Sequence, residues 1–438
     1  MTATPLLKCL AIAKRDQFLL LNVCLNQIFV QTGFASKNSK SIVFADGMFS
    51  PSQFSVKEGL QSIRISDVFL GSSHGSGASG AIRLTCIMLV RIIGLIQYTA
   101  AIIIAYPGNK LVSIRELGEL GVIRILEHKL GTSSHMAVGF GDDVSAVKLD
   151  GGRKVLVLKT DMLVGSTDVP PGMTLRQAAR KALVANISDM AAKGVAPSAG
   201  LVGLGLPAHL TKRDVNAIAY GLRDAAREYR FPLVGGDTNE SKDLTISISL
   251  FGLANCNQLV LRSGARVGDV IVVTGDFGST ASGLKALIEK KKQPNRLPRQ
   301  LFDAVYNPQA QLELGLRLAR SGALTSSIDS SDGLAWSLHE LAKASRVGVR
   351  IDSVPISSAA CEFASKFGYD ANELAFYGGE EYHIIATVKP TKVKFVEQTG
   401  HGKLRAIGRV TSRTSGVTFM HEGRELRVQR KGWEHFRR

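Results

Sequence analysis

The chain has 438 residues, of which 45% are hydrophobic and 21% are charged, a composition that excludes a disordered protein and provides for two or three domains. Its formal net charge of +17 is compatible with nucleic acid, an anionic membrane surface or polyphosphate ligands as partners. The five cysteines show neither the spacing of a zinc site nor that of a disulfide framework, so we expect a reducing, cytoplasmic setting.

Residues 1–110 differ from the rest of the chain in composition and in the pattern of apolar residues, and they form an N-terminal extension. They contain an apolar run at 18–30 that is only a weak signal-peptide pattern, a Gly/Ser-rich stretch at 71–80 and a longer apolar run at 84–106. The last run has the length of one membrane span, roughly 20 residues. Arg91 interrupts this run and costs about 2.5 kcal/mol or more if it lies centrally. Three interpretations stay open: a disordered region, a membrane anchor, and translated sequence upstream of the true start.

From Ser113 onward, apolar residues recur at helical and strand spacing, the pattern of an α/β enzyme. Thr174 can cap a helix that Gly194 ends. A short buried strand is expected to deliver Thr160 and Asp161 at its C-terminal end. The predicted helices of this half lie at 114–130, 174–194 and 211–229, and its predicted strands lie at 155–158 and 244–252.

A turn-rich segment at 255–269 separates this half from a second α/β half. The glycine turn 275–279 leads from a strand into a helix, where N–H groups can face an anion, but it lacks the ending of a Walker loop. A purely structural turn is at least an equal alternative. In the second half, segment 327–333 opens a helix that ends near 345, a further helix lies at 280–290, and strands lie at 270–274, 349–351, 382–388, 403–410 and 416–419.

Aspartates recur beside glycines or at the ends of apolar runs, and such a set indicates a site for a hard cation. Mg²⁺ takes oxygen ligands and usually joins one or two carboxylates to substrate phosphates. Asp189 lies inside an apolar helix, where Asp is unfavourable by propensity, so a functional role explains it better. A turn or cap role is the alternative for any single member, and Asp332 in particular could be a helix N-cap. The set is Asp142, Asp143, Asp161, Asp189, Asp237, Asp329 and Asp332.

Eight short motifs come in the same order as in the thiamine-monophosphate kinases, so the stretch from about Leu111 to Phe436 resembles that family. The wider superfamily includes aminoimidazole-ribonucleotide synthetase and selenophosphate synthetase, but the segment 329–334 and the Trp433 ending resemble the kinase. The motifs are Phe140-Gly141-Asp142-Asp143, Lys159-Thr160-Asp161, the segment 186–194, Gly235-Gly236-Asp237-Thr238, Arg262-Ser263-Gly264-Ala265, the segment 329–334, Gly378-Gly379-Glu380-Glu381-Tyr382 and Lys431-Gly432-Trp433.

The resemblance implies an α/β (α+β) fold of two domains, an ATP- and Mg²⁺-binding domain at 111–258 and a C-terminal domain at 259–438. The first domain would pair its sheet with that of a second subunit in a homodimer. The implied reaction is ATP plus thiamine monophosphate giving thiamine diphosphate and ADP, by direct in-line transfer assisted by several Mg²⁺ ions. Nucleic acid is not an expected partner, and membrane contact is expected only if the run 84–106 is genuine.

The resemblance also implies roles for individual residues. The acceptor phosphate is mostly ionised at neutral pH because its second pKa is about 6, so no protein nucleophile is expected. Glu380 can attract the cationic thiazolium and Trp433 can stack on it, or Trp433 is simply a buried aromatic. The implied Mg²⁺ ligands are Asp143, Thr160, Asp161, Asp189, Asp237, Asp329 and Asp332; the ATP contacts are Gly236, Asp237, Arg262 and Ser331; the substrate contacts are Asp168, Glu380 and Trp433.

Two positions depart from the family pattern. Asp168 stands where many members have His, which changes the local charge if the position contacts substrate. Lys159 stands where Ser or Thr is usual, so it adds positive charge and removes a hydroxyl ligand. Leu111 is a candidate first residue, because TTG encodes leucine and starts some prokaryotic genes.

Two other function classes stay open. One is a related ATP-dependent synthetase that keeps the carboxylates and acts on another acceptor. The other is a nucleic-acid-binding protein, which the net charge of +17 allows and which predicts aromatic residues interleaved with Lys and Arg on one face. The basic residues are instead dispersed along the sequence.

Overall fold

A computed structural model describes residues 42–44, 47–49, 112–289 and 297–436. The chain divides into two units, Met1–Pro107 and Gly108–Arg438. In the first unit, β1 (Ile42–Phe44) pairs antiparallel with β2 (Gly47–Phe49). Within the described ranges no helix has the length and apolarity to cross a membrane. The signal-like run, the Gly/Ser-rich stretch, the apolar run 84–106, Leu111 and residues 290–296 lie outside the described residues.

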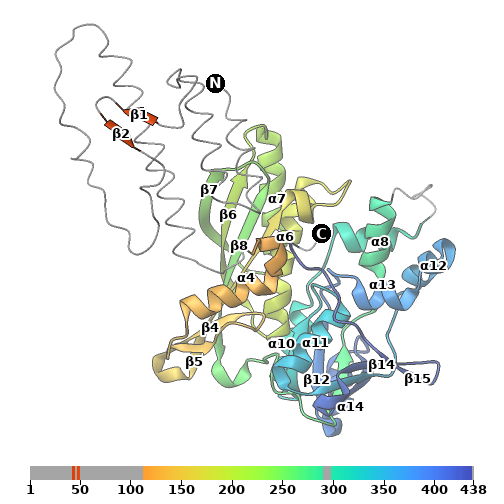
Figure 1. Cartoon of the computed structure of the whole chain (residues 1–438). Coiled ribbons are helices and arrows are strands. Elements are labelled where there is room, and N and C mark those ends of the chain that lie inside the picture. The colour runs from red at the N-terminus through yellow and green to blue at the C-terminus, as the bar shows by residue number, and fades with distance from the viewer. Residues whose placement is uncertain (1–41, 45–46, 50–111, 290–296, 437–438) are drawn as a thin grey trace. The chain divides into compact units, whose positions relative to one another are not determined.

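The first half of the second unit is built on a mixed six-stranded sheet of order β3-β4-β5-β8-β6-β7, in which β6 and β7 are parallel. Helices α6 (Leu175–Ala192) and α7 (Lys212–Glu228) lie side by side along it (Figure 1). The strands are β3 (Met136–Val138), β4 (Ser145–Leu149), β5 (Lys154–Val164), β6 (Pro197–Leu206), β7 (Leu233–Glu240) and β8 (Thr245–Asn255). Helices α4 (Ile114–Leu130) and α5 (Gly165–Asp168) complete this half, with short 3₁₀ turns at Asp150–Gly152 and Cys256–Gln258.

The predicted helices begin where their capping residues stand. The Thr174 hydroxyl accepts from the Gln177 N–H, and the Gln177 side-chain oxygen accepts from the Thr174 N–H. Thr211 and Asp214 form the same capping box at α7. Each box satisfies two N–H groups that a helix leaves unpaired, so local sequence sets both starts.

The second half is built on a mixed seven-stranded sheet of order β10-β12-β9-β13-β11-β14-β15. Its strands are β9 (Val270–Val273), β10 (Leu324–Asp329), β11 (Gly348–Ile351), β12 (Ile384–Val388), β13 (Arg405–Thr411), β14 (Val417–His421) and β15 (Arg424–Arg427). Its helices are α8 (Ser279–Ile288), α9 (Arg299–Tyr306), α10 (Leu312–Arg320), α11 (Leu334–Ser345), α12 (Ser358–Phe367), α13 (Ala371–Tyr377) and α14 (Val393–Thr399), with 3₁₀ turns at Pro390–Lys392 and Arg413–Ser415. The predicted α/β (α+β) fold class is confirmed, and each of the two halves carries helices on a mixed sheet.

The two halves share one hydrophobic core where α6 meets α10. Ile187 and Met190 of α6 belong to the same buried cluster as Leu314 and Leu318 of α10. The helices approach closely because α10 has a glycine at the contact: a Cβ on Gly315 would lie 2.1 Å from the Ala191 carbonyl oxygen. The one carboxylate of α6, that of Asp189, therefore lies on a helix that is held against the second half.

One local prediction is wrong, and one alternative interpretation is excluded. Thr160 and Asp161 do not end a strand, because β5 continues to Val164 and pairs with β8 along its whole length. The Gly-Gly-Asp-Thr motif, to which the sequence analysis gave no secondary structure, lies within β7. Asp332 is not the cap of α11, whose N-cap is Gly333 with no side-chain hydrogen bond. The strand β5 was predicted to end early because the residues in its middle are polar.

Candidate active site

Three buried aspartates converge where the two halves meet. Asp143 comes from the loop between β3 and β4, Asp189 from α6, and Asp329 from the end of β10. One carboxylate oxygen of each lies within 4.8 Å of the others. Residues separated by up to 186 positions thus form one cluster that contains only oxygen donors, the donor type that Mg²⁺ prefers.

Two cations hold Asp143 in its charged form. The Lys193 ammonium lies 2.8 Å from Asp143 and 2.7 Å from Asp142, and it donates to the Ser327 carbonyl at 2.6 Å. The Arg262 Nε donates to Asp143 at 2.5 Å. Burial alone would raise the pKa of Asp143, but the charges of Lys193 and Arg262 outweigh it and lower the pKa.

Asp189 and Asp329 are in the opposite electrostatic situation. Burial, reinforced by the charge of Asp329, raises the pKa of Asp189 well above its ordinary value, although the Lys159 ammonium lies 2.7 Å away. Burial and the charge of Asp143 raise the pKa of Asp329 to about 6, although the Ser188 hydroxyl donates to it at 2.6 Å. Carboxylates that oppose one another's ionisation are stabilised by a bound cation. The residues present therefore fit Mg²⁺.

The loop after β10 connects this cluster to the residues that the resemblance assigns to substrate. The Ser331 carbonyl accepts from the Glu380 N–H at 2.6 Å, and the Asp332 carbonyl accepts from the Trp433 N–H at 3.2 Å. Burial, followed by the charge of Glu119, raises the pKa of Asp332 to about 7. Trp433 is 42% exposed and contacts His435 edge-on. It is thus not the buried aromatic of the alternative interpretation.

Glu380 is held by a lysine that the sequence analysis did not select. The buried Lys181 of α6 lies 2.5 Å from the Glu380 carboxylate and donates to the Asp168 carbonyl at 2.8 Å. Glu380 also adopts a left-handed backbone with φ 63°, which is uncommon for a residue with a side chain. The ion pair between Lys181 and Glu380 thus connects α6 to the second half, in addition to the packing of α6 against α10.

The structure does not bring four of the predicted residues to the cluster. The Thr160 hydroxyl donates to the Ile248 carbonyl at 2.9 Å, on the sheet face opposite α6, because strand side chains alternate. The Asp168 carboxylate accepts from the Val164 N–H at 2.7 Å and closes the turn of α5. Gly236 and Asp237 are exposed in the edge strand β7.

Asp161, in contrast, faces α6. Its carboxylate lies 3.1 Å from the Lys159 ammonium.

Lys193 is the principal residue that sequence reasoning missed. It lies within the 186–194 motif, and its side chain is completely buried. The available signal was its place at the end of an apolar helix, directly before Gly194, where neighbouring helical residues are buried. The pairing with Asp142 and Asp143 could not be read from spacing, because those residues lie 50 positions upstream on another element.

The glycine turn at 275–279 is already occupied by a carboxyl group of the protein itself, that of Glu381. The buried Glu381 accepts from the Gly278 N–H at 2.8 Å and from the Thr280 N–H at 3.2 Å, at the start of α8. These are the N–H groups that a helix leaves unpaired. The structural alternative for this turn is therefore the better one.

Glu381→Gln is expected to flatten the pH dependence of stability between about pH 4.5 and 7. Burial raises the pKa of Glu381 to about 7 from an ordinary 4.5, so the folded state binds this proton more tightly than the unfolded state. The contribution is full below pH 4.5 and is lost as the pH rises through 7, by about 3 kcal/mol. Urea unfolding at several pH values measures it. Parallel curves for the two proteins would contradict it.

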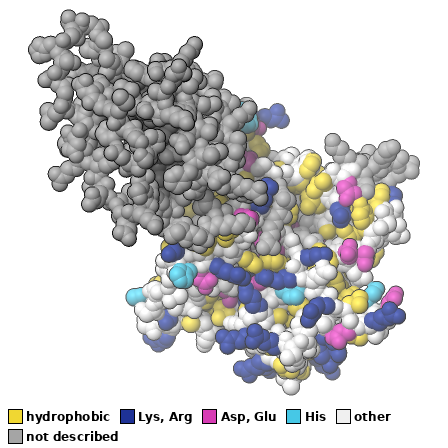
Figure 2. All heavy atoms as spheres, in the orientation of Figure 1, with side chains coloured by type: hydrophobic (Ala, Val, Ile, Leu, Met, Phe, Trp, Pro, Cys, Tyr) yellow, Lys and Arg dark blue, Asp and Glu magenta, His cyan; other side chains and the backbone are white. Residues whose placement is uncertain are grey.

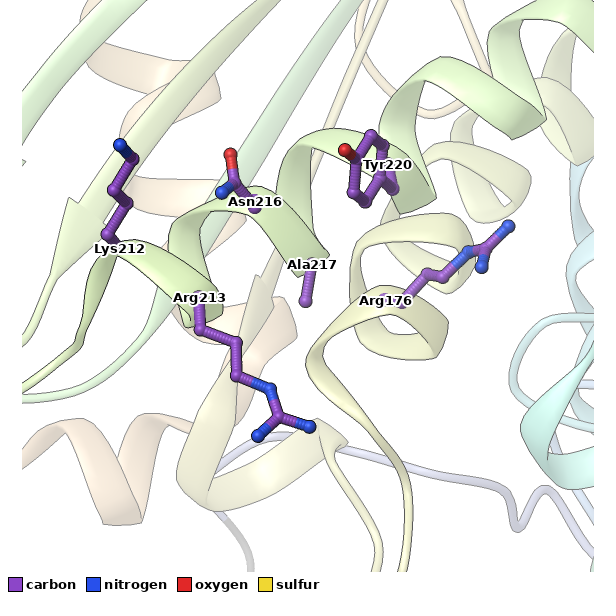
Figure 3. Close-up of a pocket in the computed structure, with 6 residues that line it drawn as sticks. All are labelled: Arg176, Lys212, Arg213, Asn216, Ala217 and Tyr220. Carbon is purple, nitrogen blue, oxygen red and sulfur yellow. The ribbon is translucent and has the colours of Figure 1, made fainter.

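A surface hollow of about 560 Å³ lies over α6 and α7, away from the carboxylates. Figure 3 shows that its basic side chains point in different directions and do not converge on one point. It is lined by Arg176, Lys212, Arg213, Asn216, Ala217 and Tyr220. We assign it no part in the site.

Comparison with known proteins matches residues 141–254 to "AIR synthase related protein, N-terminal domain" and residues 266–421 to "AIR synthase related protein, C-terminal domain". The thiamine-monophosphate kinase of Nitrosopumilus maritimus is 36% identical over 325 residues, which are 74% of this chain and 99% of the relative. That of Pyrococcus abyssi is 35% identical over 298 residues, 67% of this chain and 90% of the relative.

Solved structures give the same picture. The structure described as AaThiL complexed with AMPPCP and TMP aligns with a TM-score of 0.65 and 28% identity, and the alignment covers 75% of this chain and all of that one. HypE of E. coli, a hydrogenase maturation protein, aligns with a TM-score of 0.54 at 20% identity over 71% of this chain and 97% of that one, which shows a common fold alone.

Proposed function

Because this chain belongs to the AIR synthase related proteins and, within them, to the thiamine-monophosphate kinase family, we propose that it transfers the terminal phosphoryl group of ATP to thiamine monophosphate. The products are thiamine diphosphate and ADP. The observation that carries this proposal in the structure is the buried cluster of Asp143, Asp189 and Asp329, to which both halves contribute.

The chemistry needs alignment and relief of repulsion between two polyanions more than it needs a nucleophile, because the acceptor phosphate is already ionised. Bound Mg²⁺ would neutralise charge on the phosphates, and Asp143, Asp189 and Asp329 would hold it, together with Asp161 and Asp332. Lys193 keeps the Asp143 carboxylate ionised and fixed, so that it can bind a cation without reorganising.

We assign the thiamine part to the region around Glu380 and Trp433, which the loop after β10 places beside the acid cluster. A carboxylate and an exposed indole suit a cationic ring. Arg262 and Ser331 are assigned to ATP. Asp168 stays a proposal for substrate contact, and in the structure its carboxylate accepts from the Val164 N–H at α5.

We further propose a cytoplasmic homodimer of two-domain subunits, with the domain boundary at 258/259. Support for the dimer comes from the sheet face opposite α6, where apolar side chains of three strands are exposed: Met162, Leu201 and Leu253. Exposed apolar patches mark interaction sites. Asp237 and Thr160 lie on this face, so in such a dimer they would lie at the subunit interface.

The function is tested by ADP release with Mg²⁺, ATP and thiamine monophosphate, compared with other acceptors. Preference for thiamine monophosphate supports the proposal. Turnover only with a different acceptor supports the related synthetase instead. The nucleic-acid alternative has little support, since Figure 2 shows Lys and Arg scattered among other side chains on the visible face of the described part.

Trp433→Ala is expected to raise the KM for thiamine monophosphate by roughly 2- to 30-fold and to change the KM for ATP much less. The range corresponds to a cation–π interaction of about 0.5–2 kcal/mol. Steady-state kinetics with each substrate varied in turn measures both values, and Trp433→Phe is the control that retains a ring. Equal effects on the two substrates, with a lowered Tm, would assign Trp433 a structural role.

A chain shortened to begin at Leu111 is expected to fold and to keep its kinase activity, because the family matches and the acid cluster lie beyond this point. The native protein distinguishes a start at Leu111 from a longer chain. An intact mass that corresponds to a start near Leu111, with the protein in the soluble fraction, would support that start. Peptides from residues 46–64, or recovery only with membranes, would contradict that start.

A further inference from the structure

Lys159 lies among the carboxylates rather than at their edge. Its ammonium is 2.7 Å from Asp189 and 3.1 Å from Asp161, and its side chain is only 13% exposed. Asp161 and Lys159 both project from β5 toward α6, because they are two residues apart on one strand. The lysine therefore joins the strand and helix that carry two of the proposed metal ligands.

The cations in the described part of the site are unevenly shared. Asp143 has Lys193 and Arg262 as partners, whereas Asp189 and Asp161 share Lys159. Asp329 accepts from the neutral Ser188 hydroxyl. Lys159 is thus the positive charge closest to Asp189, the carboxylate that belongs both to this ion pair and to the three-aspartate cluster.

A cation bound to the same carboxylate must compete with this ammonium. A lysine ammonium is a compact point charge that offers no ligand atom to a metal. At a separation of a few ångströms in a buried setting, repulsion between like charges is strong. Lys159 therefore both occupies an oxygen of Asp189 and disfavours a divalent ion there.

We propose that the Lys159 ammonium is a built-in cation of this active site, which takes the place of part of the divalent-metal charge that its carboxylates would otherwise bind. This inference rests on the proposed function for the identity of the site. It goes beyond that function because it assigns to a lysine of the protein part of the charge neutralisation that bound Mg²⁺ would provide at the other carboxylates. The consequence is a lower metal requirement than the number of aspartates suggests.

The test counts metal without any turnover. The full chain and its Lys159→Met variant are titrated with Mn²⁺ alone, and free Mn²⁺ is followed by its electron paramagnetic resonance signal. We expect the variant to bind one more Mn²⁺ per chain, or to bind its tightest Mn²⁺ about tenfold more tightly. Isotherms that coincide, or weaker binding by the variant, would overturn the proposal.

Further variants keep the result interpretable. Lys159→Gln repeats the loss of charge with a polar side chain, in case the methionine variant does not fold. Lys159→Arg retains the charge, and its isotherm should follow that of the unchanged protein. Lys343→Met removes a lysine that is 63% exposed and pairs with Glu340 at 3.5 Å, so it should leave Mn²⁺ binding unchanged.

The Mn²⁺ titration and the acceptor assay test two separate proposals, and either proposal can be wrong while the other stands. If Mn²⁺ binding increases without Lys159 but thiamine monophosphate is not phosphorylated, the built-in cation stands and the proposed acceptor is wrong. If thiamine monophosphate is phosphorylated while all isotherms coincide, the function stands and Lys159 has no such role.

Discussion

Asp189→Asn is expected to lower kcat for thiamine monophosphate phosphorylation by about 10³-fold or more, while the protein stays folded. Asparagine retains the shape of the side chain and loses the charge that binds a cation. Electrostatic groups of this kind each contribute about 10²–10³ in rate, and metal-assisted charge stabilisation contributes several kcal/mol. The measurement is single-turnover ADP formation at saturating Mg²⁺ and ATP.

The fold is expected to survive this change for an electrostatic reason. Burial and nearby carboxylates already raise the pKa of Asp189, so its charged form is unfavourable in the folded state without a cation. A neutral amide removes that repulsion, although it also removes the partner of Lys159. Asp303→Asn, at an exposed ion pair of α9, is the matched control and should retain activity. Unchanged turnover of Asp189→Asn would exclude Asp189 from the site.

The parts of this fold that could be predicted are those encoded locally. Thr174 and Thr211 start helices because each side chain bonds to the N–H three residues later, an interaction visible in four consecutive letters. Asp189 could be selected because an aspartate in an apolar helix contradicts propensity. The family resemblance implied that Asp189 lies near Asp143 and Asp329. The structure adds the distance, since one carboxylate oxygen of each lies within 4.8 Å of the others.

The parts that could not be predicted depend on tertiary packing. Whether a lysine is exposed or buried depends on what covers it, so Lys181 and Lys193 read as surface residues until α6 is placed against the second half. The strand β5 was predicted too short because Lys159, Thr160 and Asp161 are polar. Its length follows from pairing with β8, which lies about 90 positions away.

Lys193→Met is expected to lower the free energy of unfolding by about 3–5 kcal/mol, the largest effect on stability that we predict. Its ammonium is completely buried and pairs with Asp142 at 2.7 Å and Asp143 at 2.8 Å. Removing one partner of a buried ion pair leaves uncompensated charge, which costs this amount. The substitution also removes the hydrogen bond from the Lys193 ammonium to the Ser327 carbonyl, which links the end of α6 to β10. Urea unfolding followed by circular dichroism measures the change.

A second substitution separates the loss of charge pairing from the loss of packing. In Lys193→Met with Asp142→Asn, one of the unpaired charges is gone, so the double variant should be more stable than the sum of the two single losses predicts, by about 1–3 kcal/mol. Lys343→Met should stay within about 0.5 kcal/mol of the unchanged protein, because the Lys343 side chain is 63% exposed and Glu340 keeps its ion pair with Arg430. If Lys193→Met costs less than about 1 kcal/mol, the two ion pairs do not hold Asp143 in place. The low pKa of Asp143, and with it a preformed carboxylate for Mg²⁺, would then need another cause, for which Arg262 is the remaining cation in contact.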